Sequence, residues 1–114
     1  MESAAIDIGT NSVLLLVADT DNGKLRVIHE EQRLPRLGKG VDKDRTLSKD
    51  SIDRTIRVLL EYRTMLSKRY PAVDDRVYLT ATSAARDASN REDFLKAIYD
   101  QTGWEVRLLG GEEE

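Results

Sequence analysis

The sequence predicts a single α/β domain built on a mixed five-stranded sheet in the order 3-2-1-4-5. The chain opens with three short apolar segments joined by two polar turns, a pattern typical of two successive β-hairpins. After position 48, helix-like and strand-like segments alternate, so each later strand follows a helical crossover and should run parallel to the first. With 114 residues, 39% hydrophobic and 34% charged, the chain can form one modest core. The strands are expected at 4–6, 13–18, 24–31, 76–81 and 104–109.

The second turn and the third strand have distinct signals. Asn22-Gly23 between two β-type segments is a strong hairpin signal, because both residues tolerate the backbone angles of a tight turn. In segment 24–31 apolar and charged residues alternate, but the pattern does not clearly assign one face to the core. Such a pattern suits a strand at the edge of a sheet.

Two helices are expected, both packed mainly on one face of the sheet. Ser48 can cap a helix over 48–69, with Pro71 ending the segment. Segment 89–92 reads as a capping box that starts a second helix, which stops at Gly103. The residues expected to face the core are Ile52, Ile56, Leu59, Leu60, Leu66, Phe94, Leu95 and Ile98.

Composition excludes several classes of protein. Cysteine is absent, so neither disulfides nor thiolate metal sites can form. The net charge of −3 argues against general binding to DNA, although a local basic pocket stays possible. The apolar segment 13–18 is far shorter than the ~20 residues that span a bilayer. No secretory signal is visible, and we expect a cytoplasmic protein without a membrane partner.

The loop after the first strand has the composition of a phosphate-binding turn. Gly9 allows close approach of the backbone to a ligand, and Thr10, Asn11 and Ser12 add polar side chains. Asp7, at the end of its strand, is placed to hold a hydrated divalent cation beside phosphate. An ordinary polar hairpin is the alternative.

A second loop, over 80–88, follows the fourth strand and is rich in small and hydroxyl residues. Hydroxyls at a strand-to-helix junction, Ser83 among them, can cap exposed N–H groups, and helix N-termini favour anions. Arg86 would project a guanidinium fork suited to phosphate. The alternative is a capped helical turn with Arg86 on the surface.

A third group of polar residues, Glu112, Glu113 and Glu114, follows the last strand. Parallel α/β sheets place their chemistry beyond the carboxyl ends of the strands, where all three loops should emerge. Phosphate cradle, cationic clamp and carboxylate base together match the needs of phosphoanhydride hydrolysis. A solvated acidic tail is the alternative for the glutamates.

The sequence resembles the exopolyphosphatase/guanosine-pentaphosphate phosphohydrolase (Ppx/GppA) family of the actin-like, sugar-kinase and Hsp70 superfamily. The matching segments lie in the family's order and span almost the whole chain, at 5–12, 36–41, 81–88, 90–95 and 111–114. Gly110 departs from the family, which commonly has serine there. The resemblance implies a ribonuclease H-like, actin-like ATPase domain.

The resemblance also implies roles for individual residues. The family's catalytic glutamate falls on Glu114, with Glu113 as second choice, and its phosphate-clamping arginine on Arg86. Its first phosphate loop maps to Asp7 and residues 8–12, and Mg²⁺ is the implied cofactor. Polyphosphate or guanosine pentaphosphate is the implied substrate.

Family members also have a second, similarly folded domain with a glycine-rich phosphate loop, and the active site lies between the two. No such motif is present in the 114 residues. The chain is therefore expected to be an N-terminal domain, inactive alone, whose partner is a C-terminal domain of the same protein. A homodimer is a candidate assembly of the full-length form.

Two other functions remain open from the sequence: a kinase of the same superfamily, and a non-catalytic module that binds phosphorylated nucleotides. Three further residues have weaker signals. His29 lacks an acidic or hydroxyl partner at a telling spacing and is expected to titrate in solvent. Trp104 is expected to pack, and Arg36 is either an anion-steering or an ordinary loop residue.

Overall fold

The computed structural model describes residues 1–39 and 45–110. Along the described chain the elements are β1 (Glu2–Ile8), β2 (Val13–Asp21), β3 (Lys24–Arg33), α1 (Lys49–Arg69), the 3-10 turn η1 (Pro71–Val73), β4 (Val77–Ala81), α2 (Ser83–Arg86), α3 (Arg91–Thr102) and β5 (Val106–Leu108).

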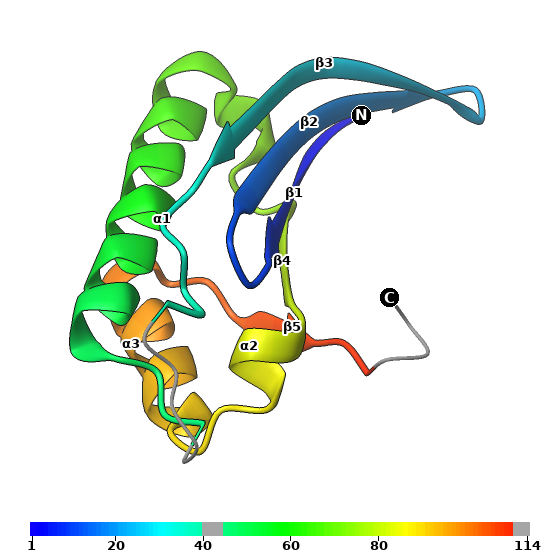
Figure 1. Cartoon of the computed structure of the whole chain (residues 1–114). Coiled ribbons are helices and arrows are strands. Elements are labelled where there is room, and N and C mark those ends of the chain that lie inside the picture. The colour runs from blue at the N-terminus through cyan, green and yellow to red at the C-terminus, as the bar shows by residue number, and fades with distance from the viewer. Residues whose placement is uncertain (40–44, 111–114) are drawn as a thin grey trace.

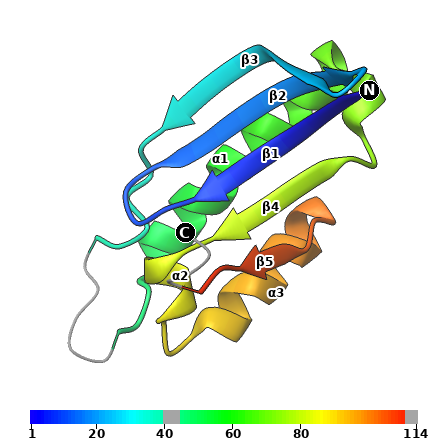
Figure 2. The same ribbon diagram turned by 90° about the vertical axis from the view of Figure 1, so that its right-hand side faces the viewer.

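The five strands form one sheet in the order β3-β2-β1-β4-β5, which confirms the predicted topology (Figure 2). β1 pairs antiparallel with β2 and parallel with β4, and β5 is parallel to β4. Because β1, β4 and β5 run in the same direction, their carboxyl ends share one edge of the sheet.

The fold has two layers, with α1 and α3 packed on the same face of the sheet (Figure 1). In β1 the alternation places Ala4, Ile6 and Ile8 in the core and leaves Asp7 on the opposite, open face. α1 contributes Leu59 and other buried side chains to the same core. Within the described part of the chain, no helix is long and apolar enough to cross a membrane.

α1 begins and ends close to the predicted limits, but two of its residues expected to face the core, Ile52 and Leu60, are only partly buried. Ser48 is the N-cap, as predicted, and its side chain accepts a hydrogen bond from the Ser51 amide. Leu60 is only half-buried, whereas Leu59 is completely buried. Leu60 therefore packs against the margin of the core and not at its centre, where Leu59 and Tyr62 lie.

The predicted capping box at 89–92 is also wrong. The N-cap of α3 is Asn90, and it makes no side-chain capping bond. Its carboxamide instead accepts from the amide of Leu47 at 2.9 Å and donates to the carbonyl of Leu47 at 3.0 Å. Ser89 makes a hydroxyl–hydroxyl bond of 2.8 Å with Thr46. A tertiary contact with segment 46–47 therefore takes the polar groups that would have capped the helix.

The edges of the sheet show two further differences. β3 extends to Arg33, two residues past the predicted end, and a bulge shifts its register between Val17 and Ala18. The Asn22-Gly23 turn is confirmed, with φ of 51° and 77°. At the other edge β5 is shorter than predicted, and Trp104 precedes it while packing against the core.

Candidate functional site

The candidate site lies where β1 and β4 end. The parallel register pairs Asp7 with Thr80 and Ile8 with Ala81, so the two following loops leave the sheet side by side. The Thr80 hydroxyl donates to Oδ1 of Asp7 at 3.1 Å. The Thr82 amide donates to the carbonyl of Ile8 at 3.2 Å and continues the pairing into the second loop.

Backbone contacts fix the shape of the first loop. The Gly9 amide donates to the carbonyl of Ser12 at 2.8 Å, closing a tight turn. A Cβ on Gly9 would lie 3.2 Å from that same oxygen, so glycine suits the close approach. Because the loop uses the Gly9 amide internally, the exposed side chains of Thr10 and Asn11 are its groups open to a ligand.

Segment 36–39 lies against the first loop and holds it in place. The amide of Gly38 donates to the carbonyl of Thr10 at 2.9 Å, and that of Arg36 donates to the carbonyl of Asn11 at 3.0 Å. A Cβ on Gly38 would come within 2.6 Å of Cγ2 of Thr10, so the two segments are in close packing contact. The backbone of Arg36 thus supports the loop, a role that the sequence did not indicate.

The second loop meets the first through one side-chain bond. Oγ1 of Thr10 lies 3.1 Å from Oγ of Ser83, and either hydroxyl can donate. Ser83 begins α2, which has only four residues, and Thr82 makes no side-chain capping bond there. The expected hydroxyl cap is therefore wrong for Thr82, and so short a helix supplies little dipole for binding anions.

Arg86 lies at the end of α2, where it joins the loop to the last strand. Nη1 donates to the carbonyl of Leu109 at 3.0 Å, and Nε pairs with the carboxylate of Asp87 at 3.2 Å. The Arg86 side chain is 25% exposed. Beside it the Leu109 amide donates to the carbonyl of Ala81 at 3.0 Å, so the chain leaves β5 past the end of β4.

A shallow hollow opens between the two loops. Its lining residues are Thr10, Gly38, Arg45, Ser83, Ala84 and Asp87. Thr10 and Ser83 were predicted from the sequence, whereas Arg45 was missed. No local pattern marks Arg45, because only the folding of segment 45–48 against the turn at 89–90 brings it here.

The predicted site residues thus divide into three groups. Thr10 and Ser83 are brought together, and Asp7 and its partner Thr80 on β4 each lie three residues before them. Arg86 is at the same edge but does not line the hollow. Glu113 and Glu114 lie outside the described residues, as does Glu112.

Asp7 is the predicted metal ligand. Its carboxylate is the one that the described site provides for a metal ion. Across residues 1–39 and 45–110, no group of three or more His, Cys, Asp or Glu side chains is arranged to hold a metal ion. Mg²⁺ commonly binds through one or two carboxylates while keeping several waters and phosphate oxygens as ligands. The exposed Asp7 carboxylate fits such a hydrated ion and does not fit an all-protein cage.

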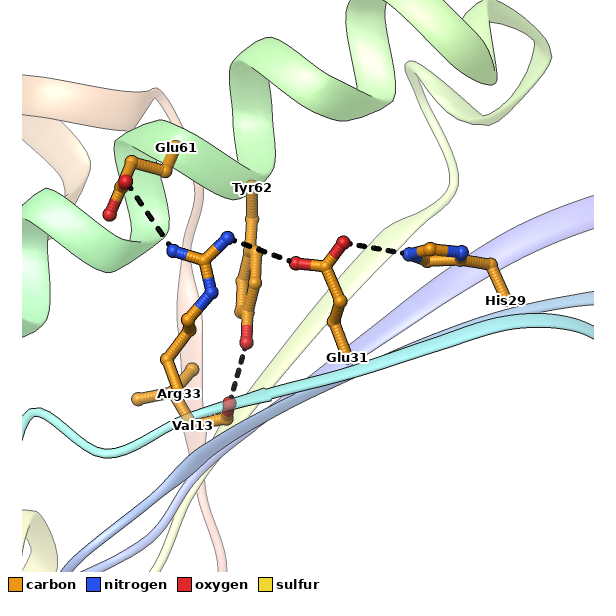
Figure 3. A network of polar contacts seen from close by, with 6 residues as sticks. All are labelled: Val13, His29, Glu31, Arg33, Glu61 and Tyr62. Carbon is orange, nitrogen blue, oxygen red and sulfur yellow. Dashed lines mark hydrogen bonds and ion pairs between the residues drawn. The ribbon is translucent and has the colours of Figure 1, made fainter.

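Three groups with shifted pKa values, Glu31, Arg33 and Tyr62, belong to a polar network between β3 and α1 (Figure 3). Nε2 of His29 lies 2.9 Å from the Glu31 carboxylate, which corrects the expectation that His29 has no acidic partner. Two residues apart on a strand, the pair shares one face of the sheet. Arg33 bonds Glu31 at 3.2 Å and Glu61 of α1 at 3.4 Å.

Tyr62 lies beneath this network. Its hydroxyl donates to the carbonyl of Val13 at 2.7 Å, and the Arg33 guanidinium lies 5.7 Å from its ring centroid. Burial, with help from the Glu31 and Glu61 charges, raises the pKa of Tyr62 to about 12. The hydrogen bond from His29 is the main cause that lowers the pKa of Glu31. These contacts stabilise the β3–α1 junction rather than the candidate site.

Sequence and structure comparisons agree on the family. The model of the Ppx/GppA phosphatase family matches residues 16–114. The chain belongs to this family. A crystal structure of an Aquifex aeolicus member of the Ppx/GppA family superposes with a TM-score of 0.89 at 38% identity, covering 98% of this chain and 36% of that one.

The names of two curated relatives state an activity. Exopolyphosphatase 2 of Mycobacterium tuberculosis is 41% identical over 104 residues, covering 88% of this chain and 32% of that protein. The bifunctional 3-dehydroquinate synthase/phosphatase of Fusobacterium nucleatum is 33% identical over 116 residues, covering 97% of this chain and 17% of that protein. The chain therefore spans at most about a third of the length of these two relatives.

Proposed function

We propose that this chain forms the phosphate-binding domain of a phosphoanhydride hydrolase that releases terminal phosphate from inorganic polyphosphate, guanosine pentaphosphate, or both. The observation that carries the proposal is the bond between Thr10 and Ser83, which joins two hydroxyl-bearing loops at one sheet edge. Membership of the Ppx/GppA phosphatase family supports the reaction class. The name of the mycobacterial relative, exopolyphosphatase 2, supports polyphosphate as the substrate.

The first loop would bind the phosphoryl group. Thr10, Asn11 and Ser12 supply polar side chains, and Gly9 closes the turn that presents them. Ser83 adds a hydroxyl from the second loop. Hydroxyl donors held in place before the reaction stabilise developing negative charge without reorganising, which is the main source of catalysis in phosphoryl transfer.

Arg86 and a glutamate would act on the reacting atoms. Arg86 would clamp the terminal phosphoryl oxygens, since a guanidinium fork matches their geometry. Glu114, or Glu113 if the register is shifted by one residue, would orient the attacking water and accept its proton. These two roles come from the family motif. They require that the glutamate carboxylate and the Arg86 guanidinium reach the same phosphoryl group.

Asp7 would hold a hydrated divalent cation, with Mg²⁺ as the proposed metal. Such an ion supplies charge neutralisation at the phosphate oxygens. The Thr80 hydroxyl bonds one oxygen of Asp7 and fixes the orientation of the carboxylate. The Asp7 side chain faces the open side of the sheet, where water can complete the coordination.

The other half of the proposed active site would come from elsewhere in the protein. The matching segment makes up 36% of the Aquifex chain, so family members of that size have further chain available. We propose a C-terminal domain with a second phosphate loop as the partner, and a homodimer as the assembly to test.

Phosphate release by the whole protein tests the proposal. We expect release from polyphosphate or guanosine pentaphosphate in the presence of Mg²⁺ and its loss on chelation. Activity on neither of these substrates nor on pyrophosphate would contradict the hydrolase. Transfer of phosphate from ATP to an acceptor would instead support the kinase, and nucleotide binding without turnover would support the binding module.

A further inference from the structure

We propose that Arg45 is a substrate-binding residue that supplies the positive charge of the hollow between the two phosphate loops. The inference rests on the proposed function and deepens it, because it adds a binding residue that no family motif identified in the sequence. The ligand class is a phosphoryl group of a polyphosphate or of a phosphorylated nucleotide.

The hollow combines hydroxyl donors with one cation. Thr10 and Ser83 line it with their hydroxyls, and Arg45 lines it from the segment that precedes α1. Its volume is about 340 Å³. Hydroxyl groups and a guanidinium are the side chains that bind phosphate oxygens, and the guanidinium can do so through two parallel bonds.

The backbone of Arg45 is held firmly at the hollow. Its carbonyl accepts from the Ser89 amide at 3.0 Å, and its φ of 56° places it in the left-handed region. The next residues, Thr46 and Leu47, bond Ser89 and Asn90 at 2.8–3.0 Å. Left-handed backbone at a non-glycine residue is costly and persists where surrounding contacts hold it. These contacts fix the backbone of Arg45, and with it the Cβ position, at the wall of the hollow.

The charges around the hollow distinguish Arg45 from Arg86. The Asp87 carboxylate, also in the lining, pairs with Nε of Arg86 at 3.2 Å, which offsets its repulsion of an anion. Among residues 1–39 and 45–110, the Arg45 side chain has neither a hydrogen bond nor an ion pair. Its donors are thus open to a ligand, while Arg86 already bonds Asp87 and the carbonyl of Leu109.

The test compares Arg45→Gln and Arg45→Lys with Arg57→Gln in the whole protein. Arg57 is exposed on α1 and does not line the hollow, so its variant controls for the same loss of charge. We expect Arg45→Gln to raise KM for polyphosphate about tenfold or more, as loss of a charge-assisted bond implies, with a smaller change in kcat. Arg45→Lys should restore part of the affinity, and Arg57→Gln should match the wild type.

Calorimetric binding of inorganic pyrophosphate gives a readout that does not depend on turnover. Arg45→Gln should weaken this binding by the same factor and reduce its dependence on salt. If KM and pyrophosphate affinity both stay unchanged in a folded Arg45→Gln protein, the inference is overturned while the hydrolase can stand. Arg45→Gly, which relaxes the positive φ, replaces the glutamine variant if that one fails to fold.

The two proposals can fail separately. A wild-type protein that hydrolyses nothing yet binds pyrophosphate through Arg45 refutes the hydrolase and supports the inference. A protein that neither hydrolyses polyphosphate nor binds pyrophosphate refutes both.

Discussion

Thr10 links three segments of the chain that are far apart in sequence. Its hydroxyl bonds Ser83, 73 positions away, and its carbonyl accepts from the amide of Gly38. A change at any of these contacts would move the hydroxyl that the proposed phosphate site uses. The packing of Gly38 against Thr10 offers a way to test this without touching the site's own side chains.

Gly38→Ala should destabilise the protein by ~1–3 kcal/mol, the usual cost of overpacking. The new Cβ would lie 2.6 Å from Cγ2 of Thr10, whose β-branched side chain has little freedom to move away. Thermal unfolding measures the effect. Gly110→Ala is the matched control, because none of the residues that the structure describes lies within 4 Å of a Cβ there. An equal loss in both variants would refute the packing argument.

Arg86→Ala should lower kcat/KM of the whole protein by the equivalent of ~2–4 kcal/mol, as removal of a preorganised donor does. It also leaves the carbonyl of Leu109 without its 3.0 Å partner, so the path of the chain after β5 loses a tether. Steady-state kinetics on polyphosphate measure the loss, with Arg57→Ala as control. Normal kcat/KM in the Arg86 variant would make the arginine purely structural.

Glu114→Gln should lower kcat by ~10²–10⁴-fold while substrate binding survives, because glutamine keeps the size of the side chain but cannot accept the water's proton. Glu112→Gln should be nearly silent. If Glu113→Gln is the inactive variant instead, the assignment is off by one residue. Activity in all three variants would make the cluster an acidic tail.

At the residue scale, the positions of site residues could be predicted where the strand topology sets them. They could not be predicted where they depend on tertiary side-chain contacts. Asp7, Thr10 and Ser83 could be placed at one edge because parallel strands bring their carboxyl ends together. The bond from Arg86 to the carbonyl of Leu109 and the position of Arg45 depend on tertiary contacts. No local pattern encodes such contacts.

Among the elements, β3 contacts α1 through polar side chains. It lies at the sheet edge, with Leu25 66% exposed near the hairpin turn. On its other half His29, Glu31 and Arg33 face α1 and form the network that ends on Glu61 (Figure 3). Edge strands with charged side chains also avoid pairing with other chains.

Glu31→Gln should flatten the dependence of stability on pH in the acid range. The pKa of Glu31 is lowered in the folded protein, chiefly by the hydrogen bond from His29. The unfolded chain therefore binds a proton more readily, and the contribution of Glu31 is present above its unfolded pKa near 4.5 and lost as the pH falls through the folded value.

Urea unfolding between pH 3 and 7 measures this effect, and Glu30→Gln is the matched control. Glu30 is the neighbouring residue on β3 and points to the opposite, open face of the sheet. If the Glu31→Gln variant loses as much stability below pH 5 as the wild type does, the prediction is contradicted.

The limits of the elements could be predicted to within a few residues, because periodicity and turn residues act locally. The extension of β3 from residue 31 to Arg33 could not, since Gln32 and Arg33 are polar and have no apolar alternation that would mark a strand. Their strand state comes from pairing with β2, where Leu14 and Val13 are their partners. The capping box at 89–92 failed for the same reason, a competing contact from Leu47.

At the scale of the whole molecule, α1 and α3 cover one face of the sheet, and no described helix covers the opposite face (Figure 1). Asp7 and Tyr78 lie on that open face, Tyr78 being 59% exposed. The hollow between the two loops is likewise shallow and open. Preorganised groups on one side can bind an anion, but excluding water and surrounding a transition state require groups from the other side.

The isolated 114-residue chain should therefore bind inorganic pyrophosphate weakly and release no phosphate from polyphosphate above the rate without protein. The described residues supply hydroxyls, Arg45, Arg86 and the carboxylate of Asp7, the proposed metal ligand, all at one edge of the sheet. Circular dichroism must first show that the chain is folded, with the whole protein assayed in parallel as the positive control. Turnover by the folded chain that Arg86→Ala abolishes would show that one domain suffices, and it would overturn the proposed need for a second phosphate loop.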